Sequence, residues 1–218
     1  MRIISATLGP LAAPSSNAIV TAAAGVANTP FTLTTSPYVL DNPRRIIITS
    51  TQTETGRTFF VVGTDWNGTQ VSETIVGVTA TAVASVYDYA TIISITPNSA
   101  TAGNITVGTN STASTRPIFL DEWAFRESTV QVNNNGTITA AIELTLDDPT
   151  SVYNPTPYTS VTWFTSSDPA ITASTASTAS YMSYFDHSPK MVRLRTTTYS
   201  AVTGSATLRV MQHASVPL

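Results

Sequence analysis

The segment from Arg44 to Gly77 constrains the fold more than any other part of the chain. It contains runs rich in β-branched and aromatic residues at 46–50, 58–63 and 70–75. Between the last two runs, Asn67-Gly68 can adopt the pair of positive φ values that a type I′ turn needs, which is a strong hairpin signal. The polar connection at 51–57 contains Gly56 and is also typical of a hairpin loop. We therefore predict a β-meander with one apolar face that other segments must cover.

The clearest alternation in the chain lies between Thr137 and Leu146. Every second residue there is apolar, which predicts a strand with one buried and one hydrated face. Apolar or alternating runs predict further strands at 31–34, 80–96 (two strands, broken near 88–90), 104–108, 118–125, 128–133, 158–164, 191–198 and 206–212. Residues 18–24 could form a strand or a short helix, and the β-branched Val20 and Thr21 favour a strand. No stretch has a helical face longer than a few turns. The sequence thus predicts an all-β fold, an antiparallel β-sandwich or jelly roll.

One stretch, Thr109–Arg116, contains no bulky apolar residue and precedes Pro117, which is typical of an exposed linker between domains. We expect an extended N-terminal arm with the first strands at 1–42, a first β-sandwich domain at 43–116 and a second, packed against it, at 117–218. Pro10 and Pro14 interrupt the start of the chain, and no apolar core of secretory length follows. No apolar run reaches the length of about 18 residues that a membrane helix needs.

Charged residues are scarce, at 11% of the chain against about 25% in ordinary globular proteins. Lys190 is the only lysine. Because soluble β-proteins often guard exposed strand edges with lysines and other charges, the edges here should be closed in a barrel or covered by neighbouring subunits. The net charge of −3 offers no general attraction to nucleic acid. The chain has no cysteine, so neither disulfides nor thiolate metal sites are expected.

Residues suited to catalysis are few. The two histidines are His187 and His213. The run Asp186-His187-Ser188 does not predict a catalytic triad, because neighbouring residues of an extended segment point in different directions. The carboxylates are scattered along the sequence, without a sign of the facing pair that glycosidases use. The segment 65–68 matches part of a calcium loop but lacks the remaining oxygen ligands, so a hairpin turn explains it better. We expect no enzyme activity, no cofactor and no metal site.

Arginines on the polar side of the last two predicted strands are the first candidate contact residues. Arg193, Arg195 and Arg209 are expected to form a basic stripe on one sheet face. Their planar forks could pair with carboxylates of a partner or bind phosphate, or could simply keep a lysine-poor face soluble. The scarcity of other surface charge favours partner contact. Trp66, at the predicted hairpin tip, either docks in a neighbour or folds back over the sheet, whereas Trp163 is expected in the core.

Several segments resemble structural proteins of tailed-bacteriophage virions. They are RRIIITSTQTETGRTFFVVGTDWNGTQVSETIVG at 44–77, SVYDYATIISITPNSATAGNITVG at 85–108 and MVRLRTTTYSAVTGSATLRVMQ at 191–212, with LTLDDPT and VTWF between them. Members of this group are particle components of β-sandwich or jelly-roll type. The resemblance lies in a pattern of strands and turns, covers most of the chain outside the N-terminal arm, and implies no catalytic residues.

This resemblance implies a virion component, and we expect a capsid decoration or cement protein on the outer surface of the head. The expected partners are the major capsid protein and further copies of the chain itself, as a homotrimer. The N-terminal arm, with Arg2, Pro10 and Pro14, is expected to lie across the shell or a neighbour. No contact with nucleic acid or membrane is expected.

Two alternatives stay open. Within the virion, the chain could be a tail or neck component, such as a tube, adaptor or minor tail protein. From a different class, it could be a carbohydrate-binding or adhesin module, since Trp66, Trp123 and Trp163 could offer stacking surfaces. A core position is the simpler explanation for Trp123 and Trp163, because both lie on apolar strand faces.

Overall fold

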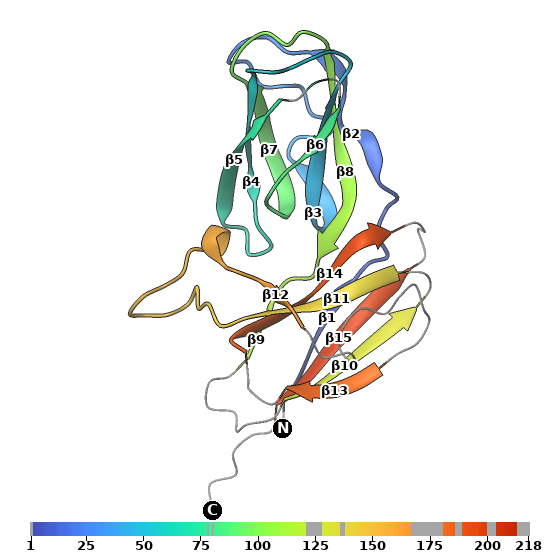
Figure 1. The fold of residues 1–218 in the computed structure, drawn as a ribbon, viewed down its shortest axis with the longest axis vertical. Helices are drawn as coiled ribbons and strands as arrows, with labels where there is room; N and C mark the ends of the chain where they lie inside the picture. The colour runs from blue at the N-terminus through green and yellow to red at the C-terminus, as the bar shows by residue number, and fades with distance from the viewer. Residues whose placement is uncertain are drawn as a thin grey trace, which may run out of the picture. The chain divides into compact units, whose positions relative to one another are not determined.

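The computed structural model of the protein is built from antiparallel β-strands (Figure 1). It describes residues 2–77, 79, 81–120, 128–135, 138–166, 181–185, 189–199 and 204–212. Apart from a 3₁₀ turn at Tyr158–Ser160, all regular structure in these residues is β-strand. The expected all-β sandwich class is therefore confirmed. The prediction succeeds because apolar and polar residues alternate in the sequence, and every second residue of strands such as 138–142 and 206–210 is buried.

Two compact units make up the chain. One comprises Ala13–Ala113 and is called the inserted unit; the other comprises Met1–Ala12 with Ser114–Leu218 and is called the split unit. The expected division is 1–42, 43–116 and 117–218. In the structure, residues 1–12 belong with the C-terminal unit and residues 13–42 belong with the unit that follows them.

The start of the chain is a strand of the split unit and not a free arm. β1 (Arg2–Leu8) pairs antiparallel along its whole length with β15 (Ser205–Gln212). On β1 itself, the side chains of Ala6 and Leu8 are buried, while those of Ser5 and Thr7 are exposed. This short alternation between small polar and apolar residues is the strand signal that the nearby prolines obscured.

The predicted linker at 109–116 is also largely strand. β8 runs from Asn104 to Ser114, and Ala113, Ser114 and Thr115 are at most 2% exposed. The small residues of this region serve close packing instead of exposure. At Gly108 an added Cβ would lie 1.7 Å from the carbonyl oxygen of Ser15, so the two backbones approach closely there.

The inserted unit contains antiparallel strands of one sheet, which pack around an apolar core. Its strands are β2 (Ser15–Ala24), β3 (Tyr38–Ser50), β4 (Thr58–Thr64), β5 (Gln70–Val76), β6 (Ala82–Ala84), β7 (Tyr89–Pro97) and β8. The hydrogen-bonded order runs β8-β3-β7-β4-β5, with β2 on β8 and β6 on β3. Side chains such as Ile46, Phe59, Ile92 and Ile105 form the core and are at most 1% exposed.

The predicted three-strand meander is only partly right. β4 and β5 form a hairpin, from Thr58 opposite Val76 to Thr64 opposite Gln70. β3 and β4 are not paired, because β7 lies between them. The connection at 51–57 therefore links separated strands instead of closing a hairpin.

The β4–β5 turn differs from the predicted type I′ turn. Only Gly68 has a positive φ, of 80°, whereas Asn67 does not. The Gly68 amide donates to the Asp65 carbonyl oxygen (3.1 Å), and the Asp65 amide donates to Thr69 (2.9 Å). This is the longer hairpin loop in which a left-handed glycine follows a tight turn. The Asp65 carboxylate accepts the amides of Asn67 (2.8 Å) and Thr69 (2.9 Å), which favours this loop over the two-residue one.

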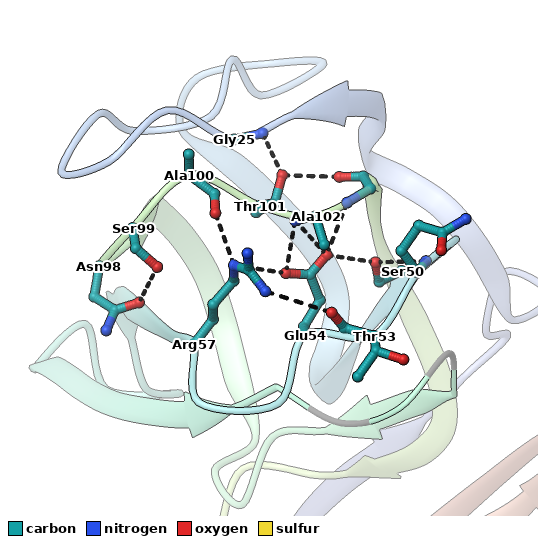
Figure 2. Close-up of polar contacts among 12 residues, drawn as sticks. Gly25, Ser50, Thr53, Glu54, Arg57, Asn98, Ser99, Ala100, Thr101 and Ala102 are labelled. Atoms are coloured by element: carbon teal, nitrogen blue, oxygen red, sulfur yellow. Dashed lines mark hydrogen bonds and ion pairs between the residues drawn. The ribbon is translucent and has the colours of Figure 1, made fainter.

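A buried carboxylate organises the 51–57 connection (Figure 2). Glu54 is 1% exposed and accepts hydrogen bonds from the Ser50 hydroxyl (2.8 Å) and from the amides of Ala102 and Gly103 (3.0 Å each). The Arg57 guanidinium lies 3.4 Å from the other carboxylate oxygen. Arg57 also donates to the Ala100 carbonyl oxygen (2.7 Å), so one acid ties the connection to the turn after β7.

The split unit is a sandwich of two sheets. The first has the order β1-β15-β10-β13, with β10 (Ser128–Asn135) and β13 (Tyr181–Phe185). In the second, β11 (Ile138–Thr145) lies between β12 (Phe164–Thr165) and β14 (Met191–Tyr199), and β9 (Ile118–Phe119) pairs with β14. The core between them contains Val130, Val132, Ile138, Ile142, Leu194, Leu208 and Val210, all 0% exposed.

Some predicted elements are absent. Residues 31–34 form no strand, although Phe31 and Leu33 are buried and the Phe31 amide donates to Ile95 (2.9 Å). Residues 158–164 contain the 3₁₀ turn and only the first residue of β12. Proline-rich flanks explain this difference, because proline cannot donate to a sheet ladder. The predicted strand end at 120–125, with Trp123, lies mostly outside the described residues.

We predict that Glu54→Gln lowers the free energy of unfolding by on the order of 3 kcal/mol, because an amide group would face donors that now meet a carboxylate. Urea unfolding monitored by circular dichroism measures the change. Thr55→Ala is the matched control in the same connection, because Thr55 is exposed, and should change stability by less than about 0.5 kcal/mol. Equal effects of the two substitutions would contradict an organising role for Glu54.

Candidate interaction surfaces

No cluster of three or more His, Asp or Glu residues in the described part of the chain could hold a metal ion. No helix in the same residues has the length and apolar content to cross a membrane. Both histidines, His187 and His213, lie outside the described residues. Large exposed hydrophobic side chains of the described residues lie on sheet faces and in loops, and these are the candidate interaction surfaces.

The predicted basic stripe is divided between two sheets. Arg193 and Arg195 lie on β14, which pairs with β11, whereas Arg209 lies on β15, which pairs with β1 and β10. Sequence alternation correctly places each arginine on the side of its strand away from the apolar core. The prediction of a single stripe is wrong, however, because β14 and β15 belong to opposite sheets of the sandwich.

Arg193 and Arg195 share an internal partner, Glu143 of β11. Nη2 and Nε of Arg193 lie 2.7 and 2.8 Å from one oxygen of Glu143, and Nη1 of Arg195 lies 3.5 Å from the other. The Trp163 ring covers this group, with its centroid 4.2 Å from Cζ of Arg193. Trp163 is half-buried and packs on a cation, instead of lying in the apolar core as expected.

The Glu143 group also changes which side of β11 is buried. The predicted apolar side continues through Ile142, but Leu144 is only half-buried and Leu146 is 78% exposed. Glu143 and Thr145, on the predicted hydrated side, are buried. Strand β11 thus leaves the apolar core at its end and contributes to a second, charged layer.

A structured loop follows β11 at 146–157. Asp148 organises it, because its carbonyl oxygen accepts the Thr156 amide (3.0 Å) and its carboxylate accepts the Thr150 amide (2.8 Å). Lys190 lies 2.7 Å from the same carboxylate. Desolvation alone would raise the pKa of Asp148, but the hydrogen bonds with Lys190 and Thr150 outweigh it and lower that pKa.

The tip of this loop is apolar and fully accessible. Val152 is 92% exposed and Tyr153 is 99% exposed, the largest values among the exposed large hydrophobic residues that the structure describes. The Ser151 hydroxyl accepts the amides of Tyr153 (3.3 Å) and Asn154 (3.2 Å), so the backbone beneath the tip has its own hydrogen bonds. In Figure 1 this loop projects away from the sheet that contains β11.

The side of the sheet β1-β15-β10-β13 that points away from the apolar core exposes several large side chains, and we call it the outer face. Antiparallel pairing places Ile3, Met211, Thr129 and Tyr184 in one row. The next row contains Ser5, Arg209, Gln131 and Met182. Residues paired across adjacent strands share one side of a sheet. Ile3, Met182 and Tyr184 are 58–69% exposed, and Arg209 is the only charged residue among these outward positions.

The remaining predicted contact residues do not come together in one described surface. Trp66 is half-buried in the β4–β5 loop, next to the buried Asp65. Pro10 and Pro14 are exposed between β1 and β2. Arg2 lies at the start of β1, and the structure does not describe its side chain. Their roles as partner contacts stay predictions.

The outer face was not predicted from the sequence, although the alternation in β10 indicates part of it. Thr129, Gln131 and Asn133 alternate with the buried Val130 and Val132, so their side is visibly outward in the sequence. What the sequence does not give is the neighbouring strand, so the apolar residues of β1 and β13 could not be added to this face.

Comparisons with known proteins give little further information. No protein-family model matches the chain, and no curated protein matches it. Among solved structures the chain is similar to one described as "Crystal structure of PBSX exported protein XepA". The similarity covers 90% of this chain and 88% of that chain, with 12% sequence identity and a TM-score of 0.28. This level of similarity supports no conclusion about function.

We predict that Glu143→Leu lowers the free energy of unfolding by about 3–5 kcal/mol, because it leaves two arginines without their shared carboxylate. The double variant Glu143→Leu/Arg193→Met should be less destabilised than the sum of its single variants. Urea unfolding of the four proteins of this cycle measures the coupling. Arg209→Met is the matched control on an exposed arginine and should change stability by less than about 0.5 kcal/mol. Additive effects of Glu143 and Arg193 would contradict the pairing.

A second prediction concerns pH. Since the folded-state pKa of Asp148 is lowered, its contribution to stability is present above the unfolded-state pKa and is lost as pH falls through the folded-state pKa. The stability difference between the wild-type protein and Asp148→Asn should therefore be present near neutral pH and shrink toward acid pH. Urea unfolding at a series of pH values below neutral measures it. A difference that grows toward acid pH would contradict this assignment.

Proposed function

We propose that the chain is a structural component of a tailed-bacteriophage virion, and specifically a capsid decoration or cement protein. The class follows from the resemblance of its strand and turn segments to virion proteins of β-sandwich type. The all-β architecture fits such a role. In this proposal the protein acts passively, by binding, and its partners are the major capsid protein and further copies of itself.

The observation that carries the proposal is the character of the accessible surface of the split unit. The outer face exposes Ile3, Met182 and Tyr184 around a single charge, and the 146–157 loop exposes Val152 and Tyr153. Large exposed apolar side chains grouped on a face are a mark of protein–protein contact. A chain with few charges gains from such contacts in a permanent assembly, where these surfaces are covered.

The mechanism that we propose is a mass-action effect on the shell. A protein that binds the assembled head, and not its separated subunits, adds its binding free energy to the stability of the head. Each contact would need to bury about 1,200–2,000 Å² to be specific and stable. Bridging neighbouring capsid subunits multiplies this gain over the many copies in a shell.

We predict that the purified protein, added to empty heads that lack it, raises the temperature at which the heads rupture by several degrees. Differential scanning calorimetry together with electron microscopy of the heated heads measures the effect. An unrelated acidic protein of similar size serves as the control and should leave the rupture temperature unchanged. Heads that bind the protein but rupture at the same temperature, or heads that do not bind it, would contradict a cement role.

Copy number separates the head from the tail or neck. A cement protein would be present in hundreds of copies per particle, whereas a neck ring contains about a dozen. Quantitative mass spectrometry of purified virions measures this number. A count near a dozen would move the proposal to the tail or neck alternative.

A further inference from the structure

The outer face and the 146–157 loop tip have complementary characters. The outer face has one cation, Arg209, whose paired neighbours Ser5 and Gln131 are neutral, and no carboxylate at its described outward positions. The loop has two carboxylates, Asp147 and Asp148, and no basic residue in its own sequence. Lys190 pairs with Asp148, so these three groups together carry one net negative charge. Each surface also exposes large apolar side chains.

We infer that the loop tip of one copy of the chain docks on the outer face of a second copy. Tyr153, at 99% exposure, would place its ring against Arg209, with Val152 among the exposed apolar side chains Ile3, Met182 and Tyr184. An arginine guanidinium against the face of an aromatic ring is favourable and becomes more so when water is excluded. Tyrosine and arginine are also the residue types that most often dominate binding at interfaces.

Charge disfavours the simplest alternative for two copies. If two outer faces stacked on each other, two Arg209 cations would be buried in one layer, and the described outward positions of either face contain no carboxylate to pair them. Burying unpaired like charges is costly. Docking of the loop instead brings a group with one net negative charge toward the face that contains the cation.

The hydrogen-bonded structure of the loop lowers the conformational entropy that is lost on docking. Hydrogen bonds from Thr156 and Thr150 to Asp148, and from the Tyr153 and Asn154 amides to Ser151, hold the backbone beneath the tip. Pro149, Pro155 and Pro157 restrict the same segment further. A loop that is already ordered loses less conformational freedom when it binds.

The contact uses different surfaces on the two copies. A contact of this kind is heterologous, so each copy still has one unused tip or face after pairing, and repetition closes a ring or extends a filament. This inference names the self-contact of the proposed virion protein. It concerns association in solution, so it can fail while head binding succeeds, and it can hold while head binding fails.

The experiment uses the full chain and three double variants. The tip variant is Val152→Ser/Tyr153→Ser, and the face variant is Met182→Ser/Arg209→Ser. The control variant, Phe60→Ser/Val86→Ser, removes exposed apolar side chains of the inserted unit. Sedimentation velocity over a range of concentrations measures association, and circular dichroism verifies that each variant is folded.

We expect the wild-type and control proteins to associate, and the tip and face variants each to associate at least tenfold more weakly. An equimolar mixture of the tip and face variants has one intact tip and one intact face, and should form a dimer of one copy of each and nothing larger. A monomeric wild-type protein, an unaffected tip variant or face variant, or a mixture that stays monomeric would each overturn the inference. A control variant that loses association equally would overturn it as well.

Discussion

Burial of carboxylates is the constraint on which much of this structure depends. Glu54 and Glu143 are only 1% and 8% exposed, and a buried carboxylate is costly unless donors surround it. Glu54 therefore collects backbone amides and a hydroxyl, and Glu143 collects two guanidinium groups. Each acid fixes neighbours that apolar packing alone would leave free to shift: the 51–57 connection in the inserted unit, and β11 against β14 in the split unit. In a chain with 11% charged residues, acids used inside leave little charge for the outside.

The sequence predicts individual strands well and their neighbours poorly. Alternation at 138–142 and 206–210 correctly marks the buried side, because burial on one face imposes a period of two. The same alternation does not indicate which strands are neighbours in a sheet. The clearest example is β7, which lies between β3 and β4 although these two follow each other in the sequence. Pairing between distant strands depends on the whole core and on contacts such as those of Glu54, which no local pattern signals.

The same limit applies to the candidate contact residues. Arg193, Arg195 and Arg209 lie on the sides of their strands that the sequence indicates, yet two of them pair with Glu143 and one faces outward from the opposite sheet. Sequence alone could not distinguish an internal ion pair from an exposed cation. The outer face becomes visible only when the register aligns Ile3 and Arg209 with residues of β10 and β13.

The pairing of β1 with β15 has a consequence for synthesis. Residues 2–8 are synthesised before the strand that receives them, residues 205–212, which is made nearly two hundred residues later. The inserted unit lies between them in sequence and contains its own core, so it can condense while β1 waits unpaired. Contacts so distant in sequence also make for slow folding, since a long loop must close before they form. The nascent chain therefore exposes an unpaired β1 until residues 205–212 have been made. In this interval a chaperone or a strand of a neighbouring nascent chain would find β1 open to binding.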